Sequence, residues 1–151
     1  MKVFLDTNVL LDILQNRMPW AEDAVVIFRA IAGKQIEGCI TAKQIADLYF
    51  FARKMYRCEE NVDAKARQVI SKLMGLFRLV DTLAVDCQNA LGVNNSDYED
   101  AVLIAAASRE KSDCIITRNT NHFMDSPIPV YTPSDFLTKM VTPFSDNPDQ
   151  L

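Results

Sequence analysis

The sequence predicts an α/β protein: a single domain of three layers, with helices on both faces of a parallel sheet. Short apolar runs alternate along the chain with amphipathic segments, which is the pattern of strands joined by crossover helices. The first run, residues 3–5, contains no polar residue and is therefore typical of a strand that is buried on both faces. A length of 151 residues suits one domain with a sizeable core.

The segment after this first strand predicts a turn and then a helix. Asp6, Thr7 and Asn8 interrupt the apolar run, and Val9 and Leu10 then open a stretch with apolar residues at helical spacing. Asp6 would stand at the carboxyl end of a strand, which is where open α/β sheets bind their ligands. The alternative is that Asp6 or Asn8 only caps the helix.

The remaining segments follow in an order that favours parallel strands, because two strands connected through a helix normally form a right-handed crossover. Apolar residues at helical spacing predict helices at residues 20–31, 42–55, 61–76, 86–91, 97–109 and 134–140. Short apolar runs predict strands at residues 36–41, 78–80, 113–117 and 129–132. We expect a turn at residues 94–96 and, after a domain of residues 1–140, a loose tail at residues 141–151.

Composition and charge argue against several classes of protein. No apolar run approaches the roughly 20 residues of a membrane span, and Asp6 and Asp12 interrupt what would have to be a signal-peptide core. The four cysteines form no close pairs and the chain has one histidine, which argues against structural zinc and fits reduced thiols in the cytoplasm. A net charge of −4 does not indicate nucleic-acid binding, so a polyanion would need a local basic patch or metal ions held by acids.

Acidic residues stand where one predicted helix begins. Ser96 and Glu99 have the spacing of a capping box, which would put Asp97 at the first helical position, and acids there complement the helix dipole. Asp100 falls on the stripe that also carries Leu103 and should face the sheet. Because a buried carboxylate needs a partner, Asp100 is a candidate functional residue.

Four carboxylates converge if the sheet is parallel, since strand ends and helix starts then share one edge. Asp6 ends the first strand, and Asp47 follows the second within two helical turns. The alternative for Asp47 is that it only pairs with Lys43 or Lys54. Asp97 and Asp100 open the helix that precedes the fourth strand. Two like charges roughly 4 Å apart repel by about 4 kcal/mol at an effective dielectric near 20, so this group needs a counter-charge. Mg²⁺ or Mn²⁺, which take oxygen ligands, would supply it.

Five segments, in their order along the chain, carry a resemblance to a known family. They are residues 3–12, 40–47, 97–101, 115–123 and 129–137. Together they resemble the PIN-domain family, many of whose members are ribonuclease toxins of VapC-type toxin–antitoxin pairs, and the resemblance covers roughly residues 2–138. It implies a five-stranded parallel sheet of order 3-2-1-4-5 and metal-dependent cleavage of RNA. It also implies a homodimer and an antitoxin protein as partner.

By position, the resemblance implies which residues hold the metal. Asp6 and Asp100 correspond to the first and third acids of the family and would be the principal ligands. Asp97 and Asp47 would complete or orient the set, although Asp47 stands where the family usually has Glu. The implied reaction is hydrolysis of a phosphodiester by a metal-activated water.

Two positions depart from the family pattern. Asn119 stands just after the fourth strand, where the family often has Asp, and would hydrogen-bond a water on the metal. His122 occupies another position where an acid is common. These departures leave open a catalytically inactive PIN-fold protein that binds a partner or RNA. A smaller alternative is an aspartyl-phosphate phosphatase with Asp6 as nucleophile, although that class has a second Asp where Asn8 stands.

Basic residues give two further hypotheses that the sequence leaves open. A basic flank for RNA, or else only a solvated helix face, would be formed by Lys43, Arg53, Lys54 and Arg57. Arg118 would either hold a phosphate or pair with the acids.

Overall fold

A five-stranded sheet forms the centre of the protein, whose computed structural model describes residues 1–93 and 97–141. Its strands lie in the order β3-β2-β1-β4-β5, and each pair of neighbours is parallel. The strands are β1 (Lys2–Leu5), β2 (Glu37–Thr41), β3 (Arg78–Val80), β4 (Cys114–Ile116) and β5 (Val130–Tyr131). The predicted parallel sheet and its strand order are therefore confirmed.

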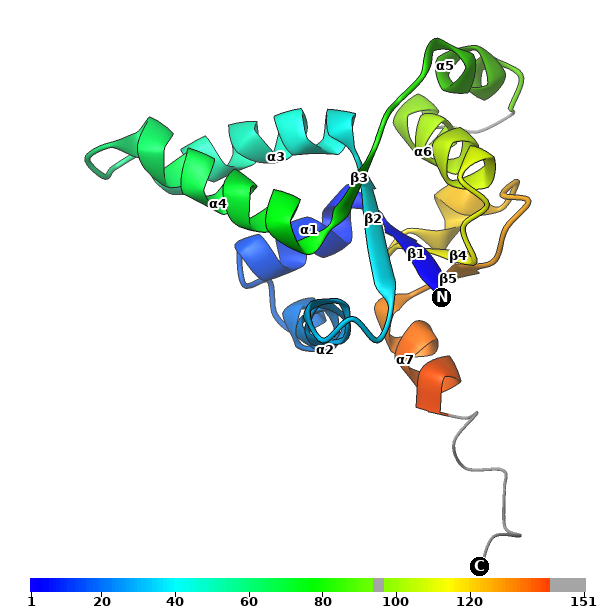
Figure 1. Cartoon of the computed structure of the whole chain (residues 1–151), viewed down its shortest axis with the longest axis horizontal. Coiled ribbons are helices and arrows are strands. Elements are labelled where there is room, and N and C mark those ends of the chain that lie inside the picture. The colour runs from blue at the N-terminus through cyan, green and yellow to red at the C-terminus, as the bar shows by residue number, and fades with distance from the viewer. Residues whose placement is uncertain (94–96, 142–151) are drawn as a thin grey trace, which may run out of the picture.

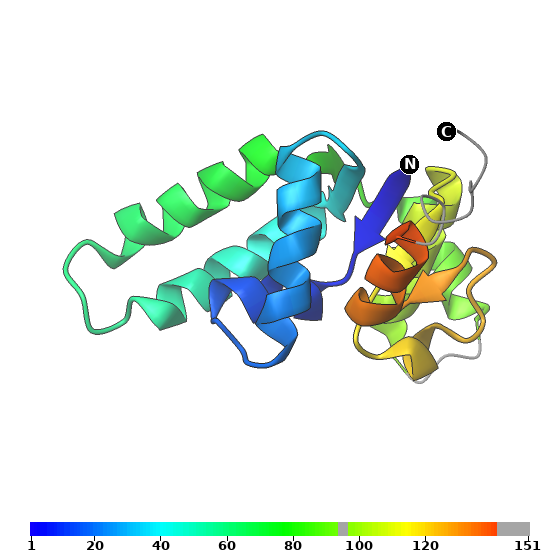
Figure 2. The same cartoon turned by 90° about the horizontal axis from the view of Figure 1, so that it is seen from below.

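Helices cover both faces of this sheet, so the three-layer prediction is also confirmed. The helices are α1 (Thr7–Leu14), α2 (Trp20–Ala32), α3 (Ala42–Met55), α4 (Val62–Leu76), α5 (Ala84–Leu91), α6 (Tyr98–Arg109) and α7 (Pro133–Val141). Helices α1, α2 and α7 pack on one face, and α6 packs on the other with α5 beside it (Figure 1). Figure 2 shows α3 and α4 as a pair that extends away from the sheet. Within the described residues, no helix combines the length and hydrophobicity of a membrane span.

The side chains of β1 fill the cores on both sides of the sheet. Val3 and Leu5 belong to the cluster under α1, α2 and α7, whereas Phe4 belongs to the cluster under α6, because successive side chains of a strand point to opposite faces. All three side chains are 0% exposed, as the absence of polar alternation in this run predicted. The end of β1, and with it the backbone of Asp6, is thereby fixed from two sides.

The start of α6 differs from the prediction. The helix begins at Tyr98 and Asp97 is its N-cap, so the expectation of Asp97 at the first helical position is wrong by one residue. The Asp97 carboxylate accepts hydrogen bonds from the backbone N–H groups of Glu99 (3.0 Å) and Asp100 (3.4 Å), which are among the amides that a first turn leaves unpaired. The expected cap, Ser96, and the expected turn at residues 94–96 lie outside the described residues.

Other elements also differ from expectation. Helix α5 begins at Ala84 rather than two residues later, because the Asp86 carboxylate accepts a hydrogen bond from the backbone N–H of Leu83 (2.9 Å) and so caps the helix from inside its first turn. A short 3₁₀ helix, η1 (Thr120–Phe123), was not predicted. Helix α7 continues to Val141, and the rest of the expected tail, residues 142–151, lies outside the described residues.

Candidate active site

Asp6 is held at the carboxyl end of β1, the central strand of the sheet. Its side chain is 7% exposed, and its backbone N–H donates to the carbonyl oxygen of Ile116 on β4 (3.0 Å). The Thr117 hydroxyl donates to Asp6 Oδ2 (2.7 Å), and Asn8 Nδ2 donates to Thr117 Oγ1 (3.3 Å). Asp6 does occupy the N-cap position of α1, but contacts from the neighbouring strand orient its carboxylate.

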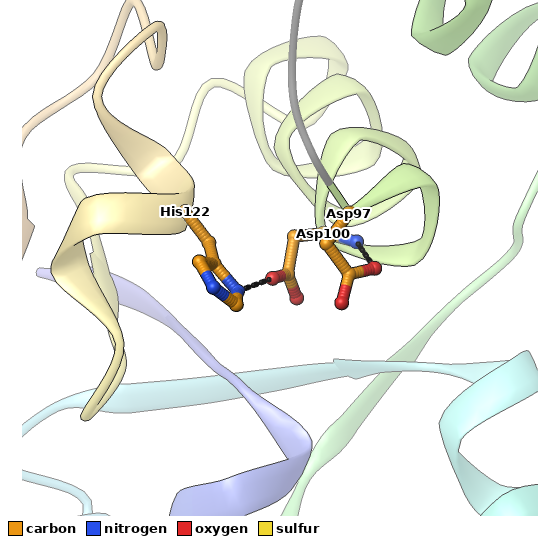
Figure 3. A group of neighbouring side chains, drawn as sticks. All are labelled: Asp97, Asp100 and His122. Carbon is orange, nitrogen blue, oxygen red and sulfur yellow. Dashed lines mark hydrogen bonds and ion pairs between the residues drawn. The ribbon is translucent and has the colours of Figure 1, made fainter.

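Asp97, Asp100 and His122 form a group of side chains that point toward one another (Figure 3). Nδ1 of His122 lies 2.9 Å from Oδ2 of Asp100. One potential ligand atom from each of the three residues lies within 4.8 Å of the other two. The acids belong to the start of α6 and the imidazole belongs to η1, which Phe123, with 1% of its surface exposed, anchors in the core under α6.

The charges of Asp6, Asp97 and Asp100 act on one another. Burial and, after it, the charge of Asp6 raise the pKa of the Asp100 carboxyl to about 6, although the hydrogen bond from His122 acts to lower it. Burial also raises the pKa of Asp6, which the hydrogen bond from Thr117 lowers and the charge of Asp97 raises. The three carboxylates therefore share one electrostatic environment, in which a cation would relieve the repulsion.

A pocket of about 460 Å³ lies beside these acids, between α3 and α6. Its lining includes Asp6 and Asp100 on one side and Lys43 and Asp47 of α3 on the other. Nζ of Lys43 lies 2.7 Å from Asp47 Oδ2 and 3.1 Å from Glu99 Oε1, so this lysine bridges α3 and α6. Among the described residues that line the pocket, Lys43 is the single basic one.

Asp47 and Asn119 lie apart from the clustered acids. Asp47 lines the pocket, but its side chain is 41% exposed and forms the ion pair with Lys43 that was the alternative to a metal role. Asn119 is exposed at the start of η1 and is not part of the described pocket lining; its backbone N–H donates to Thr117 Oγ1 (3.0 Å). Neither side chain belongs to the group of three potential ligands that includes His122.

Arg118 pairs with a different acid from those at the site. Its Nε lies 3.1 Å from Oδ2 of Asp12, whose side chain is 0% exposed, and its guanidinium carbon lies 4.4 Å from the centre of the Trp20 ring. The charge of Arg118 therefore compensates a buried carboxylate of α1, and a cation–π contact holds the guanidinium there.

Thr117 and Gln44 support the site but were not singled out in the sequence. Gln44 Nε2 donates to the carbonyl oxygen of Leu5 (2.9 Å) and to Thr7 Oγ1 (3.2 Å), which ties the first turn of α3 to the end of β1. Gln44 also forms a capping box with Thr41, and that Thr-x-x-Gln spacing can be read from the sequence. The hydroxyl of Thr117 could be found only from the register of β4 beside β1, which is a property of the folded sheet.

This parallel sheet, with acids gathered at the carboxyl ends of its strands, defines a class of α/β domain whose ligands bind at one edge. The sequence profile of the PIN domain matches residues 2–121, and the chain belongs to the PIN domain family. This match favours the PIN domain over the phosphatase alternative. No curated protein matches the sequence.

Solved structures of toxin–antitoxin systems have a similar fold. A toxin–antitoxin complex from Klebsiella pneumoniae is 21% identical, with a TM-score of 0.62 over 87% of this chain and 97% of that one. DNA-bound VapBC from Salmonella typhimurium is 15% identical, with a TM-score of 0.62 over 88% and 98% of the two chains. VapC20 from Mycobacterium tuberculosis, described as a sarcin-ricin loop cleaving toxin, is 15% identical, with a TM-score of 0.55 over 75% and 86%. At these identities the similarity shows the fold.

Proposed function

We propose that this protein is a metal-dependent ribonuclease, which hydrolyses RNA phosphodiester bonds at the edge of the sheet and serves as the toxin of a toxin–antitoxin pair. The observation that carries the proposal is the convergence of Asp6, Asp97 and Asp100 in a chain of the PIN domain family. The description of one structural relative as a toxin that cleaves the sarcin-ricin loop supports RNA as the class of substrate.

The residues at this edge fit a divalent cation. Carboxylate oxygens from Asp6, Asp97 and Asp100 are hard donors, and their mutual repulsion is relieved by positive charge. When bound, Mg²⁺ or Mn²⁺ supplies an activated water and offsets the negative charge that develops on the phosphate. Thr117 keeps Asp6 oriented through its hydroxyl, and Nδ1 of His122 lies within hydrogen-bond distance of Asp100. Asp47, and Asn119 at the start of η1, would take part through water.

The pocket beside the acids suits a single strand of RNA. Lys43 supplies a positive charge between Asp47 and Glu99, and a phosphate that approaches the acids would compete for it. Phe50 lines the same pocket with 58% of its surface exposed, so its ring is available for stacking by a base. RNA would therefore enter between α3 and α6 with its backbone toward the carboxylates.

An antitoxin protein and a second copy of the chain are the partners we propose. The structural relatives in complex with antitoxins support the antitoxin as a partner. A cytoplasmic location would follow from such a partner and from the free cysteines. The family resemblance supports the homodimer.

Cleavage of a mixed RNA substrate by the purified protein tests this function. Cleavage should require Mn²⁺ or Mg²⁺, stop in EDTA, and fall by at least about 100-fold in the Asp6→Asn and Asp100→Asn variants. Asp125→Asn is the matched control, because it removes an exposed carboxylate from the loop that follows η1. Cleavage that persists in EDTA, or in both site variants, would contradict the proposal. A folded wild type that binds Mn²⁺ but cleaves no RNA would favour the inactive PIN-fold alternative, to which Asn119 and His122 point.

A further inference from the structure

The chain contains one histidine, and it lies in the cluster of acids at the carboxyl edge of the sheet. His122 is 39% exposed at its side chain, and Asp100, which it contacts, is 15% exposed. Hydrolysis by a cation held between carboxylates does not require an imidazole at this place. The role of His122 in the cluster therefore calls for its own explanation.

The spacing of the two side chains matches that of adjacent ligands on one ion. Two ligand atoms at about 2.1 Å from an octahedral cation, at right angles to each other, lie about 3.0 Å apart. Nδ1 of His122 and Oδ2 of Asp100 lie 2.9 Å apart, and one potential ligand atom each of Asp97, Asp100 and His122 lies within 4.8 Å of the other two. A cation could thus take the place of the shared hydrogen with little movement of either side chain (Figure 3).

The position of the imidazole is fixed by the fold and not by the exposed side chain alone. The neighbouring residue Phe123 is buried with Leu103 and Ile104 of α6, so η1 and the start of the helix are held against each other. The backbone N–H of His122 also donates to the carbonyl oxygen of Asn119 (2.9 Å). The imidazole and the acids are consequently prearranged before any ion arrives.

We propose that Nδ1 of His122 is a direct metal ligand together with Asp100 and Asp97, and that this nitrogen makes the site select Mn²⁺ over Mg²⁺. Mg²⁺ strongly prefers oxygen ligands, whereas transition-metal ions accept imidazole nitrogen more readily. The inference rests on the proposed metal requirement of the ribonuclease and adds which ion the site selects. The competing role of His122 is to orient Asp100 by a hydrogen bond without touching the ion.

Pulsed electron paramagnetic resonance of bound Mn²⁺ tests direct ligation. A directly bound imidazole nitrogen modulates the electron spin echo, and in a protein without a histidine tag only His122 can give this signal. We expect nitrogen modulation in the wild type and its loss in His122→Asp, with Asn121→Ala as the control from the same turn. Bound Mn²⁺ without nitrogen modulation in the wild type would overturn the proposal and leave His122 as a positioning residue. The wild-type spectrum decides this point even if the variant does not fold.

Calorimetric titration with MnCl₂ and MgCl₂ tests selectivity. The wild type should bind Mn²⁺ more tightly than Mg²⁺, and this preference should shrink by at least about tenfold in His122→Asp, which returns the site to oxygen ligands. If the folded variant has the same ratio of Mn²⁺ to Mg²⁺ affinity as the wild type, the proposal that His122 makes the site select Mn²⁺ is overturned. These readouts are independent of RNA: nitrogen ligation without cleavage would refute only the ribonuclease, and cleavage without nitrogen ligation would refute only the role of His122.

Discussion

Asp100→Asn should stabilise the metal-free protein while it abolishes RNA cleavage. Burial and the charge of Asp6 raise the pKa of the Asp100 carboxyl from 3.8 to about 6. A rise of roughly two pKa units corresponds to about 3 kcal/mol of penalty on the ionised form, since one unit is about 1.4 kcal/mol. The asparagine keeps an acceptor for His122 but carries no charge, so the gain in the free energy of unfolding should be between about 1 and 3 kcal/mol.

Thermal unfolding at pH 7 in EDTA and in Mn²⁺ measures this effect. For a chain of this size, 1 kcal/mol corresponds to about 2–4 °C in Tm, so the variant should melt several degrees above the wild type in EDTA. Mn²⁺ should raise the Tm of the wild type and have a much smaller effect on the variant, because a ligand that binds only the folded state stabilises it. The control Asp125→Asn should change neither value by more than about 1 °C, as expected for an exposed site. An Asp100→Asn protein that is folded but melts at or below the wild-type temperature in EDTA would refute the electrostatic reasoning.

Substitutions at three other places test the support of Asp6, the ion pair between α5 and α6, and the basic flank. Thr117→Val removes the hydroxyl that binds the Asp6 carboxylate, and should lower the rate of RNA cleavage by about tenfold and the free energy of unfolding by about 1–3 kcal/mol; an unchanged rate would mean that Asp6 needs no such support. Asp86→Asn breaks the nearly buried ion pair between α5 and α6 and should cost about 3 kcal/mol in urea unfolding at pH 7. Burial raises the pKa of Asp86, but the hydrogen bonds from α6 and from the backbone outweigh it and the pKa is lowered, so this stability is present above pH 3.8 and is lost as the pH falls below it; a difference from the wild type that does not shrink as the pH falls below 3.8 would contradict this. If Arg53 and Arg57, which lie beside Phe50, form the basic flank, changing both to Ala should weaken the salt dependence of RNA binding. The slope of the logarithm of the binding constant against the logarithm of the salt concentration should become shallower by about 0.7 for each phosphate that the protein no longer neutralises. An unchanged slope would assign both residues to a solvated helix face.

Much of the fold could be predicted because local patterns agree with the final structure. The bounds of α3 and β3 coincide with the predicted residues 42–55 and 78–80, and the apolar run at residues 3–5 is the buried central strand. The start of α6 could not be placed to the residue, because Ser96 and Asp97 are both good N-caps and the choice between them is not local.

The candidate site was harder to predict than the fold. Spacing alone was enough to bring Asp6 and Asp100 to one edge of the sheet, since a parallel sheet imposes that edge. The position of the His122 imidazole could not be predicted in this way, because η1 is one short 3₁₀ turn without a strong sequence pattern of its own. The burial of Phe123 under α6 fixes where His122 lies. For Asp47 the sequence left two outcomes open, and the structure has the ion pair with Lys43, because the exposed side of α3 lets the carboxylate reach that lysine instead of the acids.

The long separation between β1 and β4 in the sequence has a consequence for how the protein is made. Thr117 and Asp6 stand 111 residues apart in the chain, yet they share a hydrogen bond at the centre of the site. A nascent chain on the ribosome therefore holds its first acid, and even the start of α6, long before the strand that orients that acid has been synthesised. Premature termination before residue 114 leaves β1 with a single neighbour, and termination before residue 117 removes the hydroxyl that orients Asp6. We expect such fragments to be inert, because the hydroxyl that holds the Asp6 carboxylate is missing from them.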